Sequence, residues 1–192
     1  TRKEADEIEI LSGIFEGKTT GTPIALLIRN TNQRSGDYGK IKGVYRPSHA
    51  DYPFDQKYGF RDYRGGGRSS GRETAARVAA GSIAKKFLEE LGICVTAYTR
   101  SIGPVIVNDE DFSLNEITQN PVNMPNNAMA EKALELISEA RENKDSIGGV
   151  VECIVTGLKP GIGETVFDKL DARLAYAIMG IGGVKAFEIG EG

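Results

Sequence analysis

"YRGGGRSSGRETAARVAAGSIAKKFLEEL", residues 63–91, joins a basic, glycine-rich segment to a run with helical periodicity. Apolar side chains recur three or four positions apart along this run, at Ala76, Ala79, Ile83, Phe87 and Leu91. This spacing predicts a helix over residues 71–91 with one apolar face. Ser70 and Glu73 have the S-x-x-E spacing of a capping box, and Gly92 marks the end of the helix.

Apolar runs elsewhere in the chain predict a mixture of strands and helices. We expect strands at 8–15, 23–30, 93–107 (one or two), 146–158 and from 184 onward, and helices at 126–144 and 168–181. Short helical turns also fit the sequence around 50–58. Because strands and helices do not follow a strict βαβ alternation, the prediction is an α+β fold rather than a doubly wound sheet.

Length and composition indicate one domain, residues 1–192, of an ordinary globular protein. The chain has 40% hydrophobic and 27% charged residues, and no apolar stretch approaches the roughly 18 residues that span a bilayer. Cys94 and Cys153 stand far apart in apolar runs, and neither belongs to a CxxC pair. They are therefore interpreted as buried, reduced thiols of a cytosolic protein, not as a disulfide or metal ligands.

Charge and aromatic side chains are concentrated in one part of the chain. Residues 29–77 contain eleven Lys and Arg against five Asp and Glu, a local balance of +6 within a chain of net charge -3. Seven of the fourteen Phe and Tyr residues lie between Tyr38 and Tyr63. Residues 31–70 show no sustained apolar period, so they are interpreted as a long basic, aromatic active-site loop with an anionic, planar partner.

The glycines at 65–67 fit two interpretations. Most such triplets are simply flexible turns. However, Arg68 and Arg72 flank the predicted helix start, where a positive charge is unfavourable unless an anion is present. Free N–H groups at a helix start also bind anions, which favours a phosphate-bearing ligand. Neither a nucleotide P-loop nor a dinucleotide-binding fingerprint is present.

The chain contains one histidine, His49. A lone histidine is more often structural than catalytic, but His49 lies beside Arg46 and Asp51 in a polar segment. An ordinary imidazole pKa of about 6.5 suits a proton donor at neutral pH. The catalytic interpretation is preferred by a small margin.

Several long segments resemble the chorismate synthase family. They are "RPSHAD" (46–51), "QKYGFRDYRGGGRSSGRETAARVAAGSIAKK" (56–86), "ILSGIFEGKTTGTPIALLIRNT" (10–31), "DSIGGVVECIVTGLKPGIGE" (145–164) and "FDKLDARLAYAIMGIGGVKAFEIGEG" (167–192). The resemblance covers nearly the whole chain. It implies a β-α-β sandwich within the α+β class and a cytoplasmic homotetramer.

The resemblance also implies an activity. Members are lyases of the shikimate pathway of aromatic amino acid biosynthesis. They convert 5-enolpyruvylshikimate 3-phosphate to chorismate and phosphate by a 1,4-anti elimination that requires reduced FMN. The resemblance leaves open whether NADPH reduces the flavin on the enzyme or another protein supplies it reduced.

Site residues follow from matching positions in the resembling segments. His49 matches an active-site histidine thought to manage protonation of the reduced flavin. Arg68, Ser69 and Ser70 match a flavin-binding Arg-Ser-Ser stretch. Arg46 and Arg72 match positions that face the substrate. No metal is implied.

The chain departs from the family pattern in three ways. Ser48 and Gly71 stand where members usually have Gly and Ala, and both are small changes. The Gly-Glu-Ser-His-Gly motif with a second active-site histidine is absent, as is the C-terminal portion. We therefore expect these residues to be the N-terminal and central part of a longer enzyme, inactive when alone.

Two other classes of function remain. The basic, aromatic loop could bind single-stranded nucleic acid by stacking and phosphate contacts. An overall pI near 5.4 argues against this, because nucleic-acid-binding domains are usually basic. Alternatively, the chain could be a structural half that only assembles with other parts. We expect neither a nucleic-acid nor a membrane partner.

Overall fold

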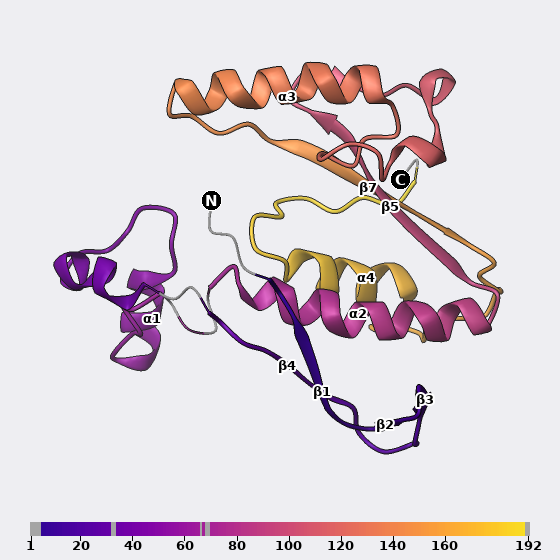
Figure 1. The fold of residues 1–192 in the computed structure, drawn as a ribbon, viewed down its shortest axis with the longest axis horizontal. Helices are drawn as coiled ribbons and strands as arrows, with labels where there is room; N and C mark the ends of the chain where they lie inside the picture. Colours follow the sequence, from indigo (N-terminus) through magenta and orange to yellow (C-terminus); the bar gives the residue numbers. More distant parts are fainter. Residues whose placement is uncertain (1–4, 32–33, 66, 68–69, 191–192) are drawn as a thin grey trace. The chain divides into compact units, whose positions relative to one another are not determined.

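The computed structural model describes residues 5–31, 34–65, 67 and 70–190. The chain divides into two compact units, one formed by residues 1–84 and 160–192 and the other by residues 85–159 (Figure 1). The boundary falls within helix α2 (Glu73–Glu90). Each unit is described by itself, and the single domain expected for residues 1–192 stays a prediction.

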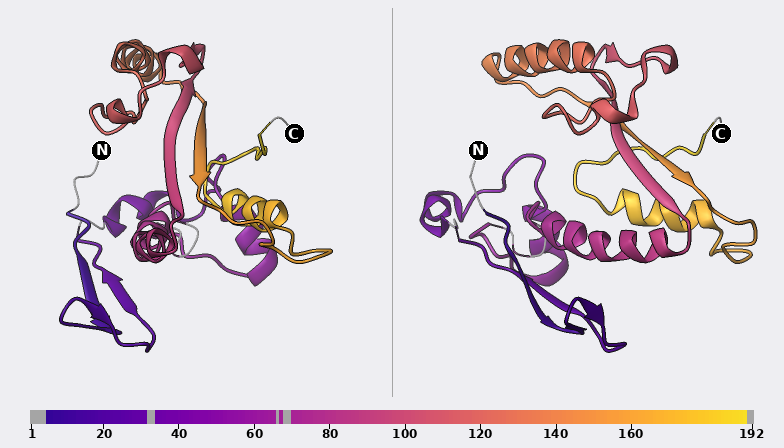
Figure 2. Two further views of the ribbon diagram at one scale, coloured as in Figure 1. Left: turned by 90° about the vertical axis from the view of Figure 1, so that its right-hand side faces the viewer. Right: turned by 45° about the vertical axis from the view of Figure 1, so that its right-hand side comes forward.

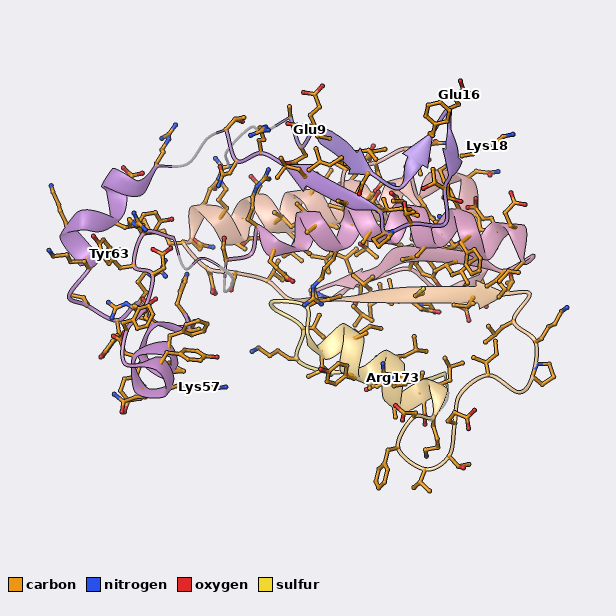
Figure 3. The ribbon with its side chains drawn as sticks, turned by 90° about the horizontal axis from the view of Figure 1, so that it is seen from below. Glu9, Glu16, Lys18, Lys57, Tyr63 and Arg173 are labelled. Carbon is orange, nitrogen blue, oxygen red and sulfur yellow. The ribbon has the colours of Figure 1, made fainter. Side chains whose placement is uncertain are left out.

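Two small antiparallel sheets begin the first unit. Strand β1 (Ile8–Ser12) pairs with β4 (Ala25–Ile28), as the two apolar runs predicted, with Ile8 opposite Ile28. Between them, β2 (Ile14–Phe15) and β3 (Lys18–Thr19) form a short hairpin. Glu16 and Lys18 lie at its tip (Figure 3).

Helices and irregular segments make up the rest of the first unit. The 3-10 helix η1 (Ser35–Ile41) and helix α1 (Asp51–Tyr58) lie within the segment predicted as a long loop, and α1 confirms the helical turns expected around 50–58. Helix α2 (Glu73–Glu90) and helix α4 (Leu170–Met179) confirm the two helices predicted at 71–91 and 168–181.

The second unit contains a three-stranded antiparallel sheet in the order β6-β5-β7. Strand β5 (Cys94–Ile102) forms a hairpin with β6 (Val105–Ile106) and pairs along its whole length with β7 (Gly149–Thr156). Both views in Figure 2 show β5 and β7 side by side. These strands confirm the predictions at 93–107 and 146–158.

Helix α3 (Asn127–Glu142) supplies one side of the core of the second unit. Its Ala130 and Ala133 pack with Val107 and Met124 in a fully buried cluster. The side chain of Asn126 caps the helix by accepting a hydrogen bond from the backbone N–H of Met129, at 2.9 Å. Two short 3-10 helices, η3 (Asp109–Asp111) and η4 (Leu114–Glu116), lie between β6 and α3.

Two predictions, one in each unit, were wrong. Cys94 and Cys153 are free thiols, as expected, but both are exposed. Seven of the eight residues of β7 are exposed, so an apolar run in the sequence did not mean a covered strand. The described residues from 184 to 190 form no strand, because they pair with none of the strands in the described part of the chain.

The mixture of small antiparallel sheets and helices confirms the α+β class. Within the residues that the structure describes, no helix combines the length and the apolar character needed to cross a membrane.

Candidate active site

Three of the predicted site residues meet at one cavity of about 430 Å³ in the first unit. Its described wall comes from the segments before α1 and before α2, and includes Tyr38, Arg46, Ser48, His49, Ala50, Gly65, Ser70 and Gly71. The predicted catalytic His49, substrate-binding Arg46 and cofactor-binding Ser70 are therefore together. Arg72 is not among the described residues of this wall, and Arg68 and Ser69 lie outside the described residues.

A tight turn before α1 places His49. Its backbone N–H donates to the carbonyl of Arg46, at 3.3 Å, and the intervening Ser48 has a φ of +60°, in the left-handed region. A left-handed backbone costs most residues about 1–2 kcal/mol, whereas glycine adopts it freely. The turn therefore gives a physical reason why glycine suits position 48.

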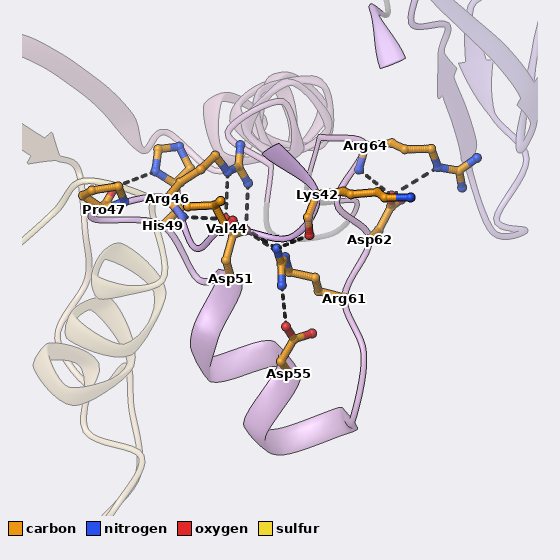
Figure 4. Close-up of polar contacts among 10 residues, drawn as sticks. All are labelled: Lys42, Val44, Arg46, Pro47, His49, Asp51, Asp55, Arg61, Asp62 and Arg64. Atoms are coloured by element: carbon orange, nitrogen blue, oxygen red, sulfur yellow. Dashed lines mark hydrogen bonds and ion pairs between the residues drawn. The ribbon is translucent and has the colours of Figure 1, made fainter. Parts of the chain in front are cut away.

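The His49 ring has one nitrogen engaged and is exposed at the cavity. Its Nδ1 lies 2.9 Å from the carbonyl oxygen of Pro47, which can only accept a hydrogen bond, so Nδ1 carries a proton (Figure 4). In the neutral ring the other nitrogen, Nε2, is then the acceptor. His49 can therefore take up or release a proton at Nε2 without losing its contact with the backbone.

Arg46 is held by the carboxylate of Asp51. Its Nε and backbone N–H donate to Oδ2 of Asp51, at 2.9 and 3.0 Å, and its Nη2 donates to Oδ1 at 2.9 Å. These bonds hold the pKa of Asp51 well below its ordinary value, because they stabilise the ionised carboxylate, and they raise the pKa of Arg46. The ring of Tyr38 lies 5.6 Å from the guanidinium carbon of Arg46.

Arg61 connects several parts of residues 42–61, the segment around the His49 turn. It forms an ion pair with Asp55 and lies 3.9 Å from Asp51, measured from Nε to Oδ1. Its Nη2 donates to the carbonyl oxygens of Lys42 and Val44, at 2.7 and 3.1 Å (Figure 4). A single guanidinium, in a side chain that is only 10% exposed, thus fixes α1 to the chain that leads into the His49 turn.

Gly59 makes the return from α1 to Arg61 possible. It ends α1 with a φ of +76°, and its N–H donates to the carbonyl of Asp55 at 2.9 Å. This left-handed helix end is one that glycine adopts without strain.

The predicted capping box at the start of α2 was wrong. The hydroxyl of Ser70 accepts a hydrogen bond from the backbone N–H of Arg72, at 3.3 Å, and the carboxylate of Glu73 pairs with Nε of Arg77, at 3.0 Å. The helix begins at Glu73, so its N-cap position falls at residue 72 and Ser70 lies two residues before it. The displacement leaves Ser70 at the cavity wall.

Arg72 interacts with the N-terminal segment of the same unit. Its Nη1 donates to Oδ1 of Asp6, at 2.5 Å, and 28% of its side chain is exposed. Its predicted contact with substrate stays a prediction.

Sequence reasoning missed Asp51, Arg61 and Tyr38 as parts of the site. The signal available for Asp51 and Arg61 was the alternation of acidic and basic residues from 46 to 62, which is typical of an internal ion-pair network. The segment was instead interpreted as a positively charged surface for a ligand. Asp51 and Asp55, however, pair with Arg46 and Arg61 and offset the charges of these two arginines.

Comparisons with known proteins agree on one family. The family model described as chorismate synthase matches residues 1–192. Curated chorismate synthases from Agathobacter rectalis and Lachnospira eligens are each 59% identical over 191 residues, and the one from Cytophaga hutchinsonii is 54% identical over 193 residues.

These relatives cover 100% of this chain, whereas the chain covers 52% of the first two relatives and 54% of the third. The chain thus spans about half the length of the curated relatives it matches. A solved structure titled "Crystal Structure of Chorismate Synthase" superposes with a TM-score of 0.75 at 34% identity, over 93% of this chain and 54% of that chain.

Proposed function

Because the chain belongs to the chorismate synthase family, we propose that it is part of an enzyme that converts 5-enolpyruvylshikimate 3-phosphate to chorismate and phosphate. The observation that carries this proposal is the cavity where Arg46, His49 and Ser70 meet. The wall combines a guanidinium, an imidazole, a hydroxyl and an aromatic ring, which suits a ligand with both anionic and planar parts.

The anionic substrate needs cationic donors. A guanidinium binds carboxylate or phosphate oxygens through parallel N–H donors, which orients the ligand as well as attracting it. Arg46 lines the cavity, and its pairing with Asp51 occupies only one edge of the guanidinium. We assign Arg46 to the substrate, and Arg72 as well on the family resemblance.

The elimination breaks a carbon–oxygen bond to phosphate and removes a proton from a carbon at the far end of the allylic system. His49 suits the proton transfers, because Nδ1 is fixed by Pro47 and Nε2 alone changes its protonation. General acid–base groups typically contribute about 10²–10⁴-fold to a rate. We propose that His49 holds and moves a proton at Nε2.

The donor set of the cavity fits reduced FMN, the cofactor of the family. Ser70 and the ring of Tyr38 would hold it, and the resemblance adds Arg68 and Ser69. When bound, reduced FMN would supply electron density to the allylic system, with no net change in its redox state over the reaction. The side chains around it must also limit access of water.

We further propose that the complete enzyme is a homotetramer. Apolar side chains of β7, among them Val151 at 71% exposed and Val155 at 43%, support this, because such side chains are usually covered in an assembled protein. Sedimentation of the full-length protein tests the stoichiometry.

An anaerobic assay tests the activity. Full-length protein, reduced FMN and 5-enolpyruvylshikimate 3-phosphate should yield chorismate and phosphate in equal amounts. Oxidised FMN should give no turnover. Absence of chorismate with reduced flavin present would overturn the proposal.

A further inference from the structure

Asp51 is the one charged side chain that is buried among the residues that the structure describes, with 6% of the residue exposed. A buried carboxylate is costly unless ion pairs and hydrogen bonds compensate it. Asp51 meets this requirement chiefly through Arg46, which gives it three hydrogen bonds, and through the nearby Arg61.

The way in which Asp51 contacts Arg46 fixes the direction of the guanidinium. Asp51 occupies the edge formed by Nε and Nη2, which is two of the five N–H donors of an arginine. The remaining donors lie on Nη1 and the outer side of Nη2. Within the described residues, Nη1 makes no hydrogen bond of its own, and Arg46 forms part of the cavity wall.

The same carboxylate also fixes the backbone that carries His49. Oδ2 of Asp51 accepts from the backbone N–H of Arg46, at 3.0 Å, while the Arg46 carbonyl accepts from the N–H of His49, at 3.3 Å. Both hydrogen bonds thus join residues of the same short segment, 46–51, and close the turn that carries His49. Displacement of Asp51 would move the Arg46 guanidinium and the His49 turn together (Figure 4).

We infer that Asp51 is a positioning residue for substrate binding: it holds Arg46 by one edge so that the other edge binds an anionic group of the substrate. This inference rests on the proposed function. It assigns Asp51 no contact with substrate, and its effect on substrate binding passes through the guanidinium of Arg46.

Asp55 provides a matched control. It is an acidic residue of the same helix and pairs with Arg61, but it makes no hydrogen bond or ion pair with Arg46 and is not part of the described cavity wall. A purely structural role for the ion-pair network would make the Asp51→Asn and Asp55→Asn variants behave alike. A positioning role separates them.

Steady-state kinetics of the full-length enzyme with 5-enolpyruvylshikimate 3-phosphate test the inference. Asp51→Asn should raise KM about tenfold or more, as expected for loss of one charged hydrogen-bonded contact, with a smaller change in kcat. Asp55→Asn should leave KM within about twofold of the wild-type value, because the contacts between Arg46 and Asp51 persist in this variant. If Asp51→Asn does not fold, Asp51→Glu keeps the charge but displaces the guanidinium and should raise KM likewise.

A double-mutant cycle with Arg46→Ala gives the decisive comparison. If Asp51 acts through Arg46, adding Asp51→Asn to Arg46→Ala should change KM by less than about twofold. Additive effects, or equal KM changes for the Asp51 and Asp55 variants, would overturn the positioning role while leaving the proposed function intact. A wild-type enzyme that forms no chorismate would instead overturn the proposed function, and this inference with it.

Discussion

The guanidinium of Arg61 lies over the ring of Tyr45, with its central carbon 4.9 Å from the ring centroid. The same side chain is only 10% exposed and bonds to two carbonyls and to Asp55. Its planar shape allows stacking and in-plane donation at the same time, which a lysine ammonium cannot reproduce. Arg61 is therefore the side chain that organises residues 42–61.

Replacement of Arg61 should destabilise this segment strongly. Arg61→Met leaves Asp55 and two carbonyls without their buried partner, and we expect the free energy of unfolding to fall by about 3 kcal/mol. Arg64→Ala is the control: Arg64 is 62% exposed and pairs with the partly exposed Asp62, so its loss should cost less than about 0.5 kcal/mol. Urea unfolding of the full-length protein measures both. Equal costs for the two variants would contradict the assigned role.

Position 48 should prefer glycine because of its backbone. Ser48→Gly and Ser48→Ala both remove the hydroxyl, but only glycine adopts the φ of +60° without strain. We expect the glycine variant to be about 1 kcal/mol more stable than the alanine variant. Thermal unfolding compares them directly. An alanine variant as stable as the glycine variant would show that the turn does not hold this conformation.

Asp51 should make stability depend on acid pH. Its pKa is lowered in the folded state, chiefly by the hydrogen bonds from Arg46, so the unfolded chain binds the proton more readily. Its contribution is therefore complete above the ordinary carboxyl pKa of 3.8 and is lost as pH falls below that value. Between about pH 4 and pH 2, Asp51→Asn should flatten the fall in the free energy of unfolding.

Arg46→Met removes the main cause of the lowered Asp51 pKa and should flatten the same curve. Urea unfolding at a series of pH values supplies the measurement. If the two variants keep the slope of the wild type, the carboxylate of Asp51 is not stabilised as its contacts indicate.

The His49 imidazole should matter for turnover far more than for stability. It is exposed, and its ring makes one hydrogen bond to a described residue, the carbonyl of Pro47. His49→Ala in the full-length enzyme should slow turnover about 10²–10⁴-fold. Its melting temperature should change little. Near-normal turnover would make His49 a structural residue.

Local periodicity was sufficient to predict most of the secondary structure. Helices α2, α3 and α4 and strands β1, β4, β5 and β7 fall where apolar spacing placed them, because each pattern is set by neighbours in the sequence. The exposure of Phe87, at 65%, and of Cys153 on β7 could not be predicted. Whether an apolar face is covered depends on residues that are distant in the sequence, and local spacing carries no information about them.

Only part of the site was predicted from the sequence. His49, Arg46 and Ser70 were identified by resemblance and do share a cavity. Asp51 was noted only as a neighbour of His49, because its role depends on the turn that directs it back to Arg46. The net charge of residues 29–77 did not indicate these ion pairs either, because a sum of charges does not reveal which of them are paired.

The 192-residue chain by itself should form no chorismate. The described wall of the cavity comes only from segments around 38–50 and 65–71, and His49 remains exposed, whereas the proposed chemistry needs water kept from the cofactor. In hydrogen exchange, amides of α3 should exchange slowly because the buried cluster of Val107 and Met124 holds the helix. Amides of residues 34–65 should exchange fast, because ion pairs rather than a buried apolar cluster hold that segment. Chorismate formation by this chain, measured under the same anaerobic conditions as for the full-length enzyme, would show that the site is already complete within it.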